Sequence, residues 1–155
     1  MLPLTRDFQE FLRLLNAHEV RYLIVGGHAV AYHGHVRNTG DLDIFVAADE
    51  GNAHKLVAAL REFGFAMPQL VPSLFTSPKS LVRMGREPNK LELMNHISGI
   101  VFEEAYPRRA VVVHEEVEMP LLGYEDLLNN KQASARPKDL GDIDELQRAH
   151  RRHGG

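Results

Sequence analysis

The sequence contains no cysteine and no tryptophan among its 155 residues. Without cysteine, the chain can form neither a disulfide framework nor a metal site built on thiolates. Aromatic residues make up only 7% of the sequence, and no platform for stacking the bases of single-stranded nucleic acid is visible. These absences leave an ordinary globular chain that depends on an apolar core.

Long hydrophobic runs are also absent. No apolar stretch approaches a length of about 20 residues, which a membrane-spanning helix needs. The first seven residues lack the basic region and apolar core of a signal peptide, so we expect a cytoplasmic protein with no membrane partner. The net charge of −3 argues against a dedicated nucleic-acid coat protein, but it is compatible with a local basic groove. The length predicts a single domain over residues 1–155.

The hydrophobic pattern predicts helices and strands in the order α-β-α-β-α-β-β-β-β-α-α. The expected helices lie at about 7–18, 27–33, 52–63, 124–135 and 137–151. The expected strands lie at about 20–25, 41–46, 81–84, 90–95, 110–114 and 118–121. The proline-rich segment 66–79 is expected to be loop and short extended pieces, and 99–106 is ambiguous. This order predicts an α+β fold with a mixed sheet and helices packed on one side.

Two aspartates, Asp41 and Asp43, open one of the expected strands. Residues i and i+2 of a strand share a face, roughly 6.5–7 Å apart. Two carboxylates on one face repel each other unless a cation lies between them, and Mg²⁺ commonly combines one or two carboxylates with substrate phosphates. Alternatively, the two aspartates have no functional role and lie on the solvent-exposed face of an edge strand, but aspartate is disfavoured in strands. The spacing therefore favours a divalent cation site.

The preceding strand ends in Gly26 and Gly27, directly before a short helix. Glycines allow a tight turn, and free backbone N–H groups at a helix N-terminus bind phosphate. The pair could also be no more than a turn. If it binds phosphate, this one segment offers a metal site and a phosphate site side by side.

The motif Gly-Gly, short helix, Arg-x-Thr-x-Asp-x-Asp and two apolar residues resembles the DNA polymerase β-like nucleotidyltransferase superfamily. Within it, the chain is most similar to small stand-alone bacterial members. These include minimal nucleotidyltransferases and the nucleotidyltransferase-type toxins of toxin–antitoxin systems. The resemblance runs from about Phe8 to Leu146 and depends on the order of the motifs. It implies a nucleotidyltransferase-like mixed sheet.

The resemblance also implies roles for individual residues. Gly26 and Gly27 correspond to the phosphate turn, and Asp41 and Asp43 to the metal ligands. Glu92, in the apolar strand at 90–95, corresponds to the third carboxylate, which binds metal or deprotonates the attacking hydroxyl. Two positions depart from the pattern: Gly27 stands where many relatives have serine, and Glu92 replaces the usual aspartate.

Three further residues are candidates for binding the triphosphate or its acceptor. Arg37 lies just ahead of the acidic pair, although it is equally readable as an ordinary loop cation. Lys131 and Asp139 occupy the late lysine and aspartate motifs that the resemblance implies. On their own, Lys131 would be a solvated helix residue, and Asp139 an acid favoured by a helix dipole.

Nine histidines raise the question of zinc. His33 and His35 lack third and fourth ligands at a familiar spacing, so we do not expect a zinc site. His28, next to the glycine turn, is a better candidate for contacting a nucleotide.

The resemblance thus implies a metal-dependent nucleotidyltransferase using Mg²⁺ or Mn²⁺. It would move a nucleoside monophosphate from a nucleoside triphosphate to a hydroxyl of an RNA end, a protein or a small molecule. The resemblance also implies a toxin or antitoxin partner protein. The alternative is a catalytically weak or inactive binding or regulatory partner, which Gly27 and Glu92 mildly favour. A third reading is a module that holds a nucleotide without turnover.

Overall fold

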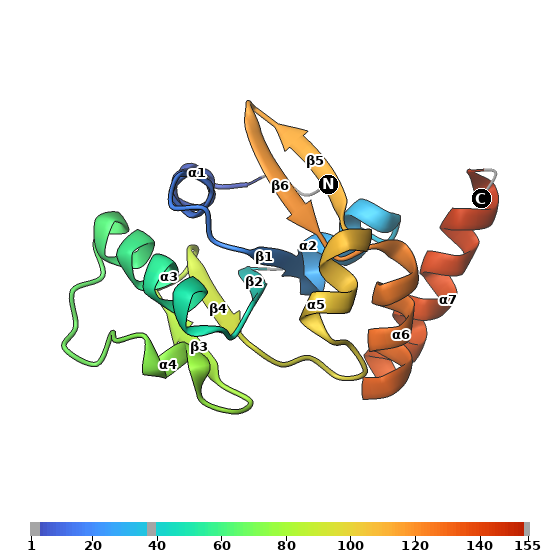
Figure 1. Ribbon diagram of the computed structural model, residues 1–155. Helices are drawn as coiled ribbons and strands as arrows, with labels where there is room; N and C mark the ends of the chain where they lie inside the picture. Colours follow the sequence, from blue (N-terminus) through green and yellow to red (C-terminus); the bar gives the residue numbers. More distant parts are fainter. Residues whose placement is uncertain (1–3, 37–39, 154–155) are drawn as a thin grey trace.

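A six-stranded mixed sheet forms the centre of the protein (Figure 1). The computed structural model describes residues 4–36 and 40–153. The strand order is β3-β4-β2-β1-β6-β5. The strands are β1 (Tyr22–Val25), β2 (Asp41–Val46), β3 (Leu81–Met84), β4 (Lys90–Met94), β5 (Ala110–His114) and β6 (Val117–Leu121).

The sheet combines three antiparallel and two parallel pairings. The antiparallel pairs are β1 with β2, β3 with β4, and β5 with β6. The parallel pairs are β2 with β4 and β1 with β6. The expected mixed sheet is therefore confirmed. The register places Asp43 of β2 between Val25 of β1 and Glu92 of β4.

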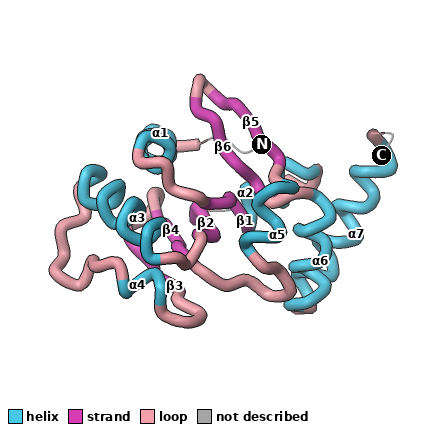
Figure 2. The backbone as a smooth tube through the Cα atoms, in the orientation of Figure 1, coloured by secondary structure: helices cyan, strands magenta, loops and turns pink. Residues whose placement is uncertain are grey.

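Helices connect and cover the strands (Figure 2). They are α1 (Arg6–Ala17), α2 (Gly26–His33), α3 (Glu50–Phe63), α4 (Ser73–Thr76), α5 (Phe102–Ala105), the 3₁₀ turn η1 (Tyr106–Arg108), α6 (Tyr124–Ser134) and α7 (Pro137–Arg152). The proline-rich segment thus contains the short helix α4, and the ambiguous segment forms α5 and η1. Within the described ranges, no helix is both long and apolar enough to cross a bilayer.

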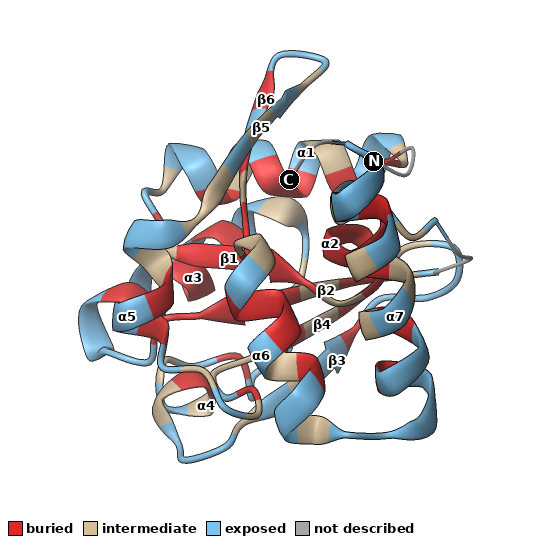
Figure 3. Cartoon of the chain, turned by 90° about the vertical axis from the view of Figure 1, so that its right-hand side faces the viewer, coloured by how far each residue is buried: buried red, intermediate tan, exposed pale blue. Residues whose placement is uncertain are grey.

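The helices lie on both faces of the sheet, which corrects the expectation that they pack on one side. All four residues of β1 are buried, as the red strand in Figure 3 shows. Because successive side chains point to opposite faces, Tyr22 and Ile24 join one core and Leu23 and Val25 another. The first core lies against α1 and α3, and the second against α5, α6 and α7. A strand that is apolar at every position needs cover on both faces.

Candidate active site

Three carboxylates meet on neighbouring strands. Asp41 and Asp43 come from β2, and Glu92 comes from β4. Each offers an oxygen, and these oxygens lie within 4.8 Å of one another. The i, i+2 spacing puts the aspartates on one face, and the parallel β2–β4 register puts Glu92 directly beside Asp43. Oxygen ligands at this separation are the donor set that a hard divalent cation takes.

The glycine turn fits tightly around Asp43. Gly26 has a φ of 66°, a conformation that side chains disfavour. A Cβ built on Gly26 would overlap the Asp43 carboxylate. The other carboxylate oxygen, Oδ1, is buried and has no hydrogen-bond partner among the described residues. A buried, unpaired carboxylate oxygen beside two further acids is costly, and a bound cation would satisfy it.

The pKa values of the acids also favour a cation site. Burial, together with the nearby charges of Glu92 and Asp41, raises the pKa of Asp43 to about 7. Burial alone would also raise the pKa of Glu92, but hydrogen bonds from Arg83 and Asp43 outweigh it and hold that pKa below its usual range. Arg83 Nε donates to Glu92 Oε1 at 2.9 Å. Without metal, the negative charge of the cluster is thus offset by Arg83 and, below about pH 7, by a proton on Asp43. A bound divalent cation would take over this role.

The acids open into a cleft of ≈ 820 Å³, a volume typical of small-molecule sites. Gly26 and Gly27 line it where β1 leads into α2. Among the residues described, no side chain caps the N-terminus of α2, so its first N–H groups are available to a phosphate. The basic residues of the lining are Arg83 from β3, His96 after β4, Lys131 from α6, and Arg136 and Lys138 around the start of α7.

Lys131 is buried and fixed at this cleft by two acids of α7. Its Nζ lies 3.3 Å from Asp139 Oδ1 and 3.1 Å from Asp142 Oδ2. Asp139 is fully buried and also accepts hydrogen bonds from Arg136 Nε at 2.7 Å and Ser134 Oγ at 2.8 Å. Burial would raise the pKa of Asp139, but Arg136, Ser134 and Lys131 together hold it well below its usual range. Lys131 is therefore no solvated helix residue.

The structure brings most of the sequence candidates into one cleft. They are Gly26, Gly27, Asp41, Asp43, Glu92 and Lys131. Asp139 lies behind Lys131 and does not line the cleft. Arg37 falls outside the described residues.

Sequence reasoning missed Arg83, Arg136 and Lys138. Arg83 becomes recognisable only from the β3–β4 register, which pairs it with Glu92. The other two flank the proline that begins α7, and only the packing of α7 against α6 turns them toward the acids.

The histidines that the sequence singled out, His28, His33 and His35, do not line the cleft. His28 is buried, packs edge-on against Phe8 and does not line the cleft. His33 Nε2 lies 2.8 Å from Leu122 O, and His35 Nε2 lies 3.6 Å from Asp142 Oδ1. In the described part of the chain, the only cluster of three potential metal ligands is the acidic triad.

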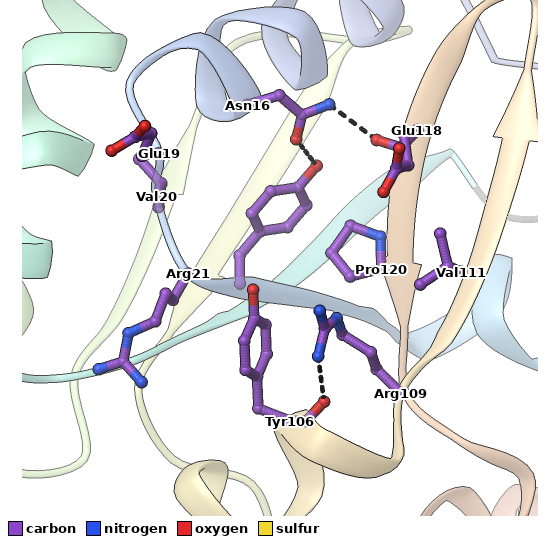
Figure 4. A pocket seen from close by; sticks show the side chains of 10 residues that line it. Asn16, Glu19, Val20, Arg21, Tyr106, Arg109, Val111, Glu118 and Pro120 are labelled. Carbon is purple, nitrogen blue, oxygen red and sulfur yellow. Dashed lines mark hydrogen bonds between the residues drawn. The ribbon is translucent and has the colours of Figure 1, made fainter.

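A second, smaller cavity of ≈ 340 Å³ lies beside β1 and β6 (Figure 4). Its lining includes Asn16, Tyr22, Arg109 and Glu118. Tyr22 Oη donates to Asn16 Oδ1 at 2.8 Å, so these polar groups are already paired. The cavity lacks the converging carboxylates and the glycine turn of the larger cleft.

Residues 4–149 match the family described as "Nucleotidyltransferase of unknown function (DUF6036)". The chain belongs to this family, and the expectation of a nucleotidyltransferase enzyme is confirmed. No functionally curated protein matches the chain.

Solved nucleotidyltransferase structures share the fold. The lincosamide antibiotic adenylyltransferase LnuA, bound to lincomycin, has a TM-score of 0.61 and 16% identity over 93% of this chain and 96% of its own. A candidate nucleotidyltransferase from Thermotoga maritima has a TM-score of 0.57 and 17% identity over 92% and 89%. ANT(2″)-Ia, in complex with adenylyl-2″-tobramycin, has a TM-score of 0.55 and 16% identity over 88% and 83%.

Proposed function

We propose that this protein moves a nucleoside monophosphate from a nucleoside triphosphate to a hydroxyl acceptor, using Mg²⁺ or Mn²⁺ bound by Asp41, Asp43 and Glu92. One observation carries the proposal: three carboxylates converge within 4.8 Å directly beside a glycine turn that leads into a helix. Membership of a nucleotidyltransferase family supports the reaction class.

When bound, the divalent ions would neutralise phosphate charge and make the acceptor hydroxyl more acidic. The chain's own residues position the reactants. The N–H groups of Gly26 and Gly27 donate to phosphate oxygens. Lys131, held in place by Asp139 and Asp142, adds a positioned ammonium group to the lining of the cleft. Catalysis would thus come from positioning and charge stabilisation.

The charged residues that line the cleft indicate which class of acceptor it can bind. Apart from the triad, the described residues that line it include no acid, whereas Arg83, Arg136 and Lys138 are basic. A polycationic acceptor would meet like charge there. An RNA end, a protein hydroxyl or an uncharged small molecule fits better.

The test is to incubate the protein with each labelled nucleoside triphosphate, Mg²⁺ or Mn²⁺, and total cellular RNA, protein or small-molecule extract. Label should appear in one acceptor fraction, with release of pyrophosphate. The matched controls are Asp41→Asn and addition of EDTA, and both should abolish labelling. Labelling that persists in either control would disprove the proposal.

We further propose that the reaction serves a toxin–antitoxin pair, as the resemblance to toxins of this fold implies. Expression of the wild-type chain alone in bacteria should then arrest growth, and Asp41→Asn should not. Equal growth of both strains, at equal protein levels, would remove the toxin role and leave the enzymatic proposal standing.

A further inference from the structure

Strand β5 forms one edge of the sheet, and its hairpin with β6 projects from the fold (Figures 1 and 3). In the described chain, β5 pairs with β6 only. One face of this strand carries Val111, which is 50% exposed, and Val113, which is 67% exposed. Proteins usually protect an apolar edge strand with charges, a bulge or a covering element. The exposed valines therefore suggest that another strand covers this edge.

The register shows which backbone groups face outward. The hairpin closes at the pair His114–Val117 through Glu115 and Glu116, both with positive φ. A two-residue turn of this kind follows a hydrogen-bonded pair, and such pairs alternate along antiparallel strands. Val111 and Val113 therefore point their N–H and C=O groups away from β6. Pro120, opposite Val111, agrees with this assignment because proline has no N–H to donate.

The charges flanking β5 are self-complementary. Arg108 and Arg109 precede the strand, and Glu115 and Glu116 follow it. In two antiparallel copies centred on Val112, the arginines of each copy face the glutamates of the other. The same register places Val111 against Val113 of the second copy, with their outward backbone groups in position to bond. We propose that the protein forms a two-fold dimer through antiparallel pairing of β5 with β5 of a second copy.

Arg109 is the better placed of the two arginines for this contact. Its guanidinium lies over the Tyr106 ring, 4.1 Å from the centroid, and its Nη1 donates to Tyr106 O at 2.9 Å (Figure 4). Its Nη1 is therefore engaged, and pairing with Glu115 uses the other guanidinium N–H groups. Arg108 is instead committed to Asp126, at 2.9 Å and 3.0 Å.

The dimer would leave both catalytic clefts open, because β1 and β6 separate β5 from the acidic strands β2 and β4. The inference is thus independent of the proposed reaction. Sedimentation equilibrium over a concentration series should show a reversible dimer, with a Kd on the order of micromolar for so small an interface. A chain that stays monomeric up to about a hundredfold that concentration would overturn the proposal.

Charge reversal tests the register. Arg109→Glu and Glu115→Arg should each weaken dimerisation about tenfold or more, because like charges then meet twice across the two-fold axis. An equimolar mixture of the two variants should restore wild-type affinity, since opposite charges face each other in the mixed pair. Glu118→Arg, on β6 of the same hairpin, is the control and should leave the dimer affinity unchanged.

Val113→Lys places a charge on the unpaired edge strand and should give a folded monomer. A dimer unaffected by Arg109→Glu and Val113→Lys, or a mixture that restores nothing, would contradict β5 pairing.

Discussion

The carboxylate of Asp43 occupies the space that a side chain on Gly26 would need. The two residues come from different elements, α2 and β2, that are brought together by the antiparallel β1–β2 pair. The phosphate turn and the acidic centre are therefore one unit, because a side chain added at Gly26 displaces an acid.

Gly26→Ala should accordingly impair the site as well as the fold. We expect a stability loss of about 1–3 kcal/mol from the positive φ, and loss of metal-dependent nucleotide binding because Asp43 is displaced. Gly64→Ala is the control for backbone strain alone, since Gly64 has a positive φ of 127° but nothing within 4 Å of a built Cβ. Urea unfolding and calorimetry would compare the two variants. Normal nucleotide binding by Gly26→Ala would refute the coupling.

Asp43 should also make the metal-free protein sensitive to pH. Its folded pKa of about 7 lies above its unfolded value, so the native state binds more protons between about pH 4 and pH 7. The stability that this group contributes is complete below pH 4 and is lost as the pH rises through 7. In EDTA at pH 8, Asp43→Asn should therefore be more stable than the wild type, on the order of 1–3 kcal/mol.

The advantage of Asp43→Asn should shrink at pH 5, where the wild-type Asp43 is largely protonated. Adding Mn²⁺ at pH 8 should raise the Tm of the wild type and leave that of Asp43→Asn nearly unchanged. An Asp43→Asn protein less stable than the wild type in EDTA at pH 8 would show that the carboxylate is not strained by burial.

Much of the fold was predictable from local patterns. The expected strands at 41–46 and 110–114 match β2 and β5, because both contain runs of apolar, largely β-branched or aromatic residues. Helices α1 and α3 begin earlier than the apolar periodicity predicts, because the residue that caps each N-terminus lies further upstream. Thr5 caps α1 through a hydrogen bond from Phe8 N, and Asp49 caps α3 through one from Asn52 N.

The site was only partly predictable, because some of its relationships are not local. The spacing of Asp41 and Asp43 is a property of one strand, so the sequence alone puts them on one face. Glu92 joins them only through the parallel β2–β4 register. The position of Asp139 behind Lys131 depends on how α7 packs on α6, which periodicity does not specify.

Nucleotide binding should depend on the metal. The acids repel a triphosphate unless an ion bridges them, so EDTA should weaken binding about tenfold or more in calorimetry. Asp41→Asn should lower transferase activity at least about a hundredfold while leaving the circular dichroism spectrum unchanged. A degenerate binding module would bind weakly with or without EDTA. Strong binding that ignores the chelator would contradict the metal-dependent mechanism.

The buried ion pairs of α7 should be important for stability. Asp139→Asn leaves Lys131 with one acid fewer in a buried position, so at pH 7 it should cost about 3–5 kcal/mol. Because the pKa of Asp139 lies well below its usual range, this contribution is complete above about pH 4 and is lost as the pH falls below that value. The difference in unfolding free energy between Asp139→Asn and the wild type should therefore shrink at pH 3.

Asp144→Asn is the control. It breaks an exposed pair with Arg148 on the same helix and should cost less than about 1 kcal/mol. Equal losses in the two variants would mean that the buried network contributes no more than a surface ion pair.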